Sequence, residues 1–128
     1  MRTIMIAGHA LICSLGLGVG LAALPAEAAQ NRCGWVQNPT PGNYWLDDRD
    51  GSWTILTQGS DVEPTGIETL PDFSAGDFVK TNGNYGYACA CMSVETDRAG
   101  MRITGIRSVK QLPLAKCSND RSLPKPEG

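Results

Sequence analysis

The chain contains one histidine, His9, and this residue lies within a segment that resembles a secretory leader. The chain after that segment has no imidazole group. This excludes Ser/His/Asp and Cys/His catalysis, a histidine general base and the usual mixed Cys/His zinc site. Any catalysis would have to rest on carboxylates alone, and we therefore expect no enzyme, no metal ion and no cofactor.

Residues 1–28 have the features of a secretory signal peptide. Arg2 gives a basic start, residues 4–24 are mostly apolar, and residues 26–28 form a small-residue cleavage site. A membrane anchor is the alternative, because the apolar run approaches the length that spans a bilayer. No basic stop-transfer flank follows it, so we expect cleavage after Ala28, no stable membrane anchor, and export to the periplasm or the extracellular space.

Loss of the leader also removes Cys13 and leaves an even set of four cysteines. In an exported protein such a set predicts two structural disulfides. A bridge between the two central cysteines would join side chains that project in parallel from one strand, and we rank it last. Each of the outer two then pairs with one of the central two, in an order that the sequence leaves open. The four residues are Cys33, Cys89, Cys91 and Cys117.

Residues 81–95 form the most regular stretch of the chain. Alternation with period two places two tyrosines and two cysteines on one face of a strand, and glycine, alanine, methionine and valine on the other. Asn82-Gly83 is a strong hairpin signal, since a tight turn of this kind needs positive φ angles. We expect residues 78–81 to pair with the start of the central strand.

Further strands are predicted at residues 44–46, 52–58 and 101–112. In the last of these, the apolar side chains change face at Gly105, where a bulge would restore one buried face. There is no internal repeat and no convincing amphipathic helix. The sequence therefore predicts a single all-β domain at residues 29–117, a small antiparallel sheet or closed or half-closed barrel of five or six strands, stapled by two disulfides. Residues 118–128 are predicted to be a flexible tail.

Residues 59–76 lack a sustained periodicity and are rich in turn formers and acidic residues. Loops of this length in a compact domain are often functional or disordered. Ile67, Leu70 and Phe73 are placed to attach the loop to the core. An ordered flap is therefore favoured over a free linker, and it would be the natural insertion element of a binding protein.

Three aspartates at Asp47, Asp48 and Asp50 precede Gly51 and invite a calcium or acid/base interpretation. A calcium loop of the EF-hand type requires alternating oxygen ligands and a closing glutamate, which this stretch lacks. A hairpin turn explains the same residues. The net charge is −2, and the basic residues near the end of the chain are too few and too mixed with apolar residues to form a nucleic-acid surface.

Aromatic residues make up only 6% of the chain, and several gather in residues 35–53. Each of them can serve as core, but Tyr44 and Trp45 are adjacent in a predicted strand and cannot both face inward. Aromatic rings beside polar groups suit a binding surface. The candidate binding residues are Trp35, Asn43, Tyr44, Trp45 and Asp47.

Two functions fit a small, rigid, disulfide-stapled β domain. The first is a non-catalytic binding or inhibitor module for a protein partner outside the cytoplasm. The alternative is a glycan or cell-wall binding domain that uses the aromatic residues as a platform. An enzyme that rests on carboxylates is a third and weaker hypothesis.

Four separated segments resemble an uncharacterised family of small bacterial exported proteins, a domain of unknown function. The resemblance implies an exported single domain with paired cysteines, and it brings no activity, cofactor or catalytic residue. The segments are RCGW at residues 32–35, NPTPGNYWLDDRDGSW at residues 38–53, TNGNYGYACACM at residues 81–92 and LPLAKC at residues 112–117.

Overall fold

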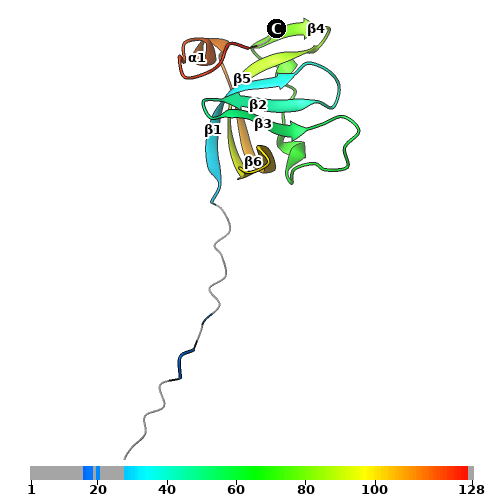
Figure 1. Cartoon of the computed structure of the whole chain (residues 1–128). Helices are drawn as coiled ribbons and strands as arrows, with labels where there is room; N and C mark the ends of the chain where they lie inside the picture. Colours follow the sequence, from blue (N-terminus) through cyan, green and yellow to red (C-terminus); the bar gives the residue numbers. More distant parts are fainter. Residues whose placement is uncertain (1–15, 19, 21–27, 127–128) are drawn as a thin grey trace, which may run out of the picture.

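The computed structural model describes residues 16–18, 20 and 28–126, and the β domain lies within residues 28–126 (Figure 1). The signal peptide predicted for residues 1–28 lies almost wholly outside the described residues. In the part of the chain that is described, no helix has the length and apolar composition needed to cross a membrane.

In the described residues, the secondary structure consists of six strands, two 3-10 turns and one short helix. The strands predicted at residues 44–46, 52–58, 78–81 and 101–112 are present, with ends that differ by one or two residues. The central strand starts four residues after the beginning of the 81–95 stretch, and the strand at residues 30–38 was not predicted. The elements are β1 (Gln30–Asn38), β2 (Tyr44–Asp48), β3 (Gly51–Leu56), η1 (Ile67–Thr69), η2 (Phe73–Ala75), β4 (Phe78–Asn82), β5 (Tyr85–Asp97), β6 (Arg102–Leu112) and α1 (Leu114–Ser118).

Five strands close into a ring in the order β1-β2-β3-β6-β5, because β1 also pairs with β5. The strand β4 lies outside the ring and pairs with the first residues of β5, next to the end of β6. The all-β class and the small barrel are thus confirmed. The sheet is mixed rather than purely antiparallel, because β3 meets β6 in a short parallel contact at Thr54 and Arg102. Such a contact joins segments far apart in the sequence, and no local pattern signals it.

The long strand β5 organises the ring as the sequence predicts. It pairs with β1 on one side and with both β4 and β6 on the other. The β4–β5 hairpin is confirmed, although its two-residue turn is Gly83-Asn84 rather than Asn82-Gly83, because Asn82 pairs with Tyr85. Gly83 has a φ of 59°, and no other residue of this turn has a positive φ.

The barrel interior holds the main hydrophobic core. Its residues come from every strand of the ring, and Trp53 and Leu46 are its largest fully buried members. The bulge predicted at Gly105 is present: Glu95 pairs with Gly105 and the next pair is Thr96 with Ile103, so the register shifts there. This shift lets Ile103 and Ile106 both face the interior.

The long loop, residues 59–76, packs against the barrel. Phe73 is buried, and Ile67 and Leu70 pack on the interior cluster, as the sequence predicts. Gly66 lies so close to the carbonyl oxygen of Ile106 that a β-carbon could not fit. The apolar side chains of the loop therefore complete the fold.

The two disulfides are Cys33–Cys91 and Cys89–Cys117. Barrel closure determines this pairing, because the β1–β5 register places Cys33 directly opposite Cys91. Cys89 then takes Cys117 on α1. The two bridges indicate an oxidising compartment, since such bonds are rare in the cytoplasm.

Candidate functional site

The candidate site lies on the outer face of the sheet, where large side chains point away from the barrel interior. Residues opposite each other on paired strands point to the same face. One row across the outer face runs through Asp47, Trp35 and Cys89, and the next runs through Trp45, Gln37 and Tyr87. These two rows are continuous across β2, β1 and β5.

A second, smaller apolar cluster, which we call the outer cluster, is built on the first row. Trp35, Cys89 and Cys117 are its buried members, and Leu114 and Leu123 pack against it. Trp35 is only 3% exposed, and its ring meets that of Tyr87 edge-on at 5.3 Å between centroids. Since these side chains point away from the barrel interior, something outside the sheet must cover them.

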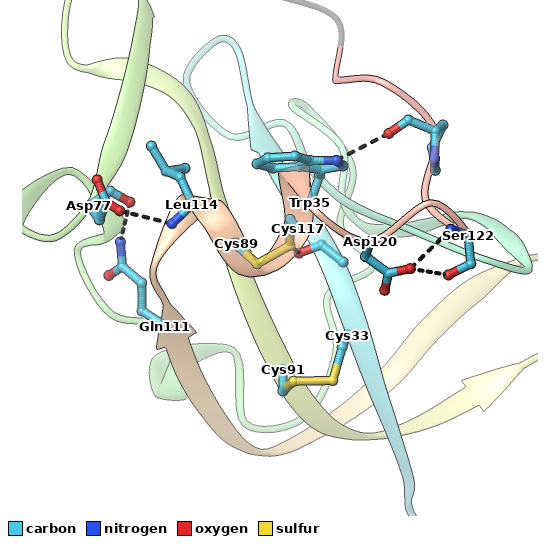
Figure 2. The surroundings of a disulfide bond; sticks show 12 residues. Cys33, Trp35, Asp77, Cys89, Cys91, Gln111, Leu114, Cys117, Asp120 and Ser122 are labelled. Atoms are coloured by element: carbon cyan, nitrogen blue, oxygen red, sulfur yellow. Dashed lines mark hydrogen bonds between the residues drawn. A yellow bond between two sulfur atoms is a disulfide. The ribbon is translucent and has the colours of Figure 1, made fainter.

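The helix α1 and the chain that follows it supply this cover (Figure 2). Asp77 accepts a hydrogen bond from the backbone N–H of Leu114 at 2.8 Å and so fixes the start of α1. The disulfide from Cys117 attaches α1 to β5. The helix α1 is therefore tied to β5 by a covalent bond and to Asp77, the residue before β4, by a charged hydrogen bond.

Beyond α1, a tight turn directs the chain back onto the outer cluster. Asp120 Oδ1 accepts hydrogen bonds from the backbone N–H and the hydroxyl of Ser122, at 3.0 and 2.6 Å. The hydrogen bonds from Ser122 hold the pKa of Asp120 below its ordinary value. Leu123 then packs on the cluster, and the Trp35 Nε1–H donates to the carbonyl oxygen of Pro124 at 3.1 Å (Figure 2).

Two hollows flank this C-terminal segment, which comprises residues 123–126. The first hollow has a volume of about 530 Å³ and lies over the β2–β3 hairpin, with Trp45 and Asp47 in its wall. The second hollow has a volume of about 400 Å³ and is lined by Tyr87 and Val79 on the other side. Pro124 and Lys125 line both hollows, so the segment separates them.

Trp45 is the one tryptophan of the three that packs in neither hydrophobic cluster. It is half-buried. Its Nε1–H donates to Asp47 Oδ2 at 3.3 Å, and the hydroxyl of Ser52 donates to the other oxygen of that carboxylate. Asp47 thus orients the indole in the first hollow.

Gln37 lies between Trp45 and Tyr87 in the second row, and these two neighbours line the first and the second hollow, respectively. It is 3% exposed, and its Nε2 is the one buried side-chain nitrogen or oxygen among the described residues that lacks a hydrogen-bond partner. A buried donor without a partner costs roughly 1–3 kcal/mol. A bound acceptor that reached Gln37 would recover this cost.

A third hollow, of about 460 Å³, is polar and lies at the end of the barrel. Arg32 lies in its wall and donates to Asp48 and Asp50 at 2.8 and 2.9 Å, while its guanidinium stacks 4.0 Å from the centre of the Trp53 ring. Burial opposes the charge of Arg32, but the hydrogen bonds to Asp48 and Asp50 hold its pKa above the ordinary value. These contacts balance the charge and close the barrel, so we assign the network to stability.

The aspartates of the turn each have a structural partner. Trp53 donates to the buried Asp48 at 3.0 Å, and the hydrogen bond from Arg32 lowers the pKa of Asp50. Within the residues that the structure describes, no cluster of three His, Cys, Asp or Glu side chains is placed to hold a metal ion. The hairpin-turn explanation of these residues accounts for their contacts.

Four of the five candidate binding residues meet at the first hollow: Asn43, Tyr44, Trp45 and Asp47. The fifth, Trp35, is separate, because it is buried under the C-terminal segment and offers no open ring face. Tyr44 also packs on the interior cluster, and burial raises its pKa. As expected for neighbours in a strand, Tyr44 reaches the core while Trp45 stays outside it.

Sequence reasoning did not single out Gln37, Leu123 and Pro124. The site role of Gln37 depends on its pairing with both Trp45 and Tyr87, which no local pattern shows. The predicted flexibility of residues 118–128 stays a prediction, but up to Pro126 this part of the chain lies against the sheet. Pro124 and Pro126 were the signal in the sequence that could have indicated this docked segment, because prolines favour extended segments that dock on other surfaces.

A comparison with known protein families identifies the family of this chain. Residues 27–124 match the family described as Protein of unknown function (DUF4087). The chain belongs to this family. The match agrees with the resemblance seen in the sequence, and it extends to Leu123 and Pro124, the first two residues of the C-terminal segment. No curated protein and no solved structure matches the chain significantly.

Proposed function

We propose that this DUF4087 protein is a non-catalytic binding module that acts outside the cytoplasm on a protein partner. The observation that carries the proposal is the position of Trp45. It is a half-buried tryptophan in the wall of a 530 Å³ hollow, and neither hydrophobic cluster includes it. Aromatic anchors beside polar groups are typical of the energetic centre of protein interfaces.

The scaffold supports this role. Trp45 and Asp47 are on β2, between β1 and β3, and the two disulfides fix β1 and α1 to β5. A site on paired strands holds its side chains more precisely than a loop does, so less conformational entropy is lost on binding. The two disulfides agree with an oxidising compartment. An aromatic platform for glycans is less favoured, because Trp35 and Trp53 are buried.

Site-specific cross-linking in the native host tests the proposal. A photoreactive residue replaces Thr54, which lines the first hollow, and a control replaces Glu68, which is exposed on η1 and outside both hollows. We expect a defined protein adduct from position 54 that is absent from position 68 and is lost when Trp45→Ala is added. Trp45→Ala should spare the fold, because Trp45 is in neither cluster.

Two results would overturn the proposal. Equal adducts from both positions would mean unspecific contact. If position 54 gives no protein adduct while the protein sediments with cell-wall sacculi at low and at high salt, and does so only with Trp45 intact, the glycan alternative is correct.

A further inference from the structure

The segment that covers the outer cluster has the chemistry of an extended peptide ligand. Pro124 and Pro126 have fixed φ angles and no N–H group, and each forces the residue before it toward an extended conformation. Such a segment favours the polyproline II helix, whose carbonyl oxygens have no internal hydrogen bonds. It therefore offers hydrogen-bond acceptors, with no donor at either proline.

The strand below the segment offers donors. Trp35 Nε1–H already binds the carbonyl oxygen of Pro124, whereas Gln37 Nε2 has no partner among the described residues. Both side chains project from the outer face of β1. The carbonyls of a regular polyproline II helix return to one side only at every third residue, about 9.3 Å apart. Residues two apart on a strand, in contrast, point to the same side and are about 6.6 Å apart, and the carbonyls of an extended, strand-like peptide repeat in the same way. One extended peptide that runs along β1 can thus accept from both donors.

The two hollows show that the chain's own segment fills only part of this surface. They lie on either side of Pro124 and Lys125 and together leave room for side chains of a larger ligand. Asp47 lies in the wall of the first hollow and Asp120 in the wall of the second. Carboxylates on both sides of Lys125 favour a basic residue between the prolines.

We propose that the outer groove, formed by Trp35, Gln37, Trp45, Tyr87 and Val79, binds a proline-containing, basic extended segment of a partner protein, and that the chain's own residues 123–126 occupy it as an internal competitor. This inference rests on the proposed function and names the class of its partner. Aromatic-lined grooves recognise such segments because the polyproline II helix loses little entropy on binding. The bound partner accepts hydrogen bonds from both Trp35 and Gln37.

The internal competitor is held weakly enough to leave. The Asp120–Ser122 turn fixes the chain as far as Ser122, and Leu123 is only partly buried against the outer cluster. From Pro124 to Pro126, the bond from Trp35 is the single hydrogen bond in the described part of the chain. A typical net hydrogen bond changes an equilibrium constant by about fivefold. A partner that also satisfies Gln37 therefore displaces the segment.

Fluorescence anisotropy with a labelled synthetic peptide tests this inference. The probe repeats the sequence Leu-Pro-Lys-Pro twice, and its control has alanine in place of every proline. The oxidised wild-type protein is compared with the full-length variant Pro124→Gly/Pro126→Gly, in which the internal segment loses its extended preference. We expect the glycine variant to bind the probe at least about fivefold more tightly than wild type, and the alanine control peptide to bind at least about tenfold more weakly than the probe.

A pair of glutamine variants separates binding from stability. In the glycine background, Gln37→Met removes the unpaired donor, so we expect an affinity about fivefold lower together with an unchanged or raised Tm. Gln111→Met is the matched control, because Gln111 Nε2 donates to the carbonyl oxygens of Phe73 and Asp77, outside the groove. This control should lower Tm and leave the affinity unchanged.

Several outcomes would overturn the inference. Equal binding of the proline and alanine peptides would exclude this class of ligand, as would an affinity that Gln37→Met does not change. If wild type and the glycine variant bind the probe equally, residues 123–126 are not a competitor. A dimer that only the wild type forms would make a second copy the occupant. If the probe fails while cross-linking from Thr54 still depends on Trp45, the proposed function stands and the peptide class is wrong.

Discussion

The interior cluster and the outer cluster are both hydrophobic, but they are closed in different ways. A ring of five strands surrounds the interior, and Arg32, Asp48 and the long loop close its ends. The outer cluster lies on the opposite face of the same strands, and a five-residue helix, one disulfide and a C-terminal segment cover it. Opening the interior requires breaking the barrel, whereas opening the outer cluster requires moving only the end of the chain.

Because of this difference, we assign the stability of the domain mainly to the interior cluster and its binding function to the outer face. The interior uses its aromatic and charged groups fully, since Trp53 both fills the core and donates to Asp48. On the outer face, Trp45 belongs to neither cluster, and Gln37 Nε2 has no hydrogen-bond partner in the described part of the chain. Regions of low local stability are the ones from which binding surfaces are drawn.

The largest expected effect distinguishes the two tryptophans of the hairpin. Trp53→Ala removes a fully buried side chain, its hydrogen bond to Asp48 and the ring on which Arg32 stacks, so we expect a loss of about 3–5 kcal/mol in the free energy of unfolding. Trp45→Ala should change it by less than about 0.5 kcal/mol. Urea unfolding followed by circular dichroism measures both. Similar losses would show that Trp45 is part of the core.

The next effect concerns the bridge that holds the outer cover. Cys89→Ala/Cys117→Ala removes a disulfide that spans 28 residues, and the chain-entropy model gives a loss of about 3.5 kcal/mol. We expect the far-ultraviolet spectrum of the barrel to survive while the emission of Trp35 shifts toward that of an exposed indole. A spectrum without β structure at 25 °C would mean that the two clusters are not separable.

The smallest expected effect is on stability at acid pH, and it concerns the pair of Arg32 and Asp50 at the end of the barrel. The hydrogen bond from Arg32 holds the pKa of Asp50 below its ordinary value of 3.8. Because the folded pKa is depressed, the contribution of Asp50 is fully present above about pH 4 and is lost as the pH falls through the folded value. Asp50→Asn should therefore show a shallower fall of Tm below pH 4. A curve parallel to that of wild type would show that the pair contributes nothing.

Much of the fold could be predicted because strand patterns are local. Alternation in residues 81–95 assigned Cys89 and Cys91 to the face opposite Ala90 and Met92, since the side-chain period of a strand is two. The bulge at Gly105 followed from the change of face between Ile103 and Ile106. These statements need only the parity of positions along one strand.

The pairing between strands could not be predicted in the same way. The cysteine pairing depends on Cys33 lying opposite Cys91, and the parallel contact of β3 with β6 joins distant segments. The site depends on such pairings as well, because Gln37 becomes part of the groove only through its two neighbours in the row. The sequence grouped Trp35 and Trp45 as candidate binding residues, but the strand register places them in different rows of the sheet.

Hydrogen exchange of the three indole N–H groups, followed by nuclear magnetic resonance, tests most directly whether the outer cluster has a removable cover. The Trp53 group, bonded to the buried Asp48, should exchange only through global unfolding, and the Trp35 group through departure of residues 123–126. We predict that Trp35 exchanges faster than Trp53, and that Pro124→Gly/Pro126→Gly accelerates exchange at Trp35 alone. Exchange at Trp35 as slow as at Trp53, and unchanged by the glycine pair, would contradict this account.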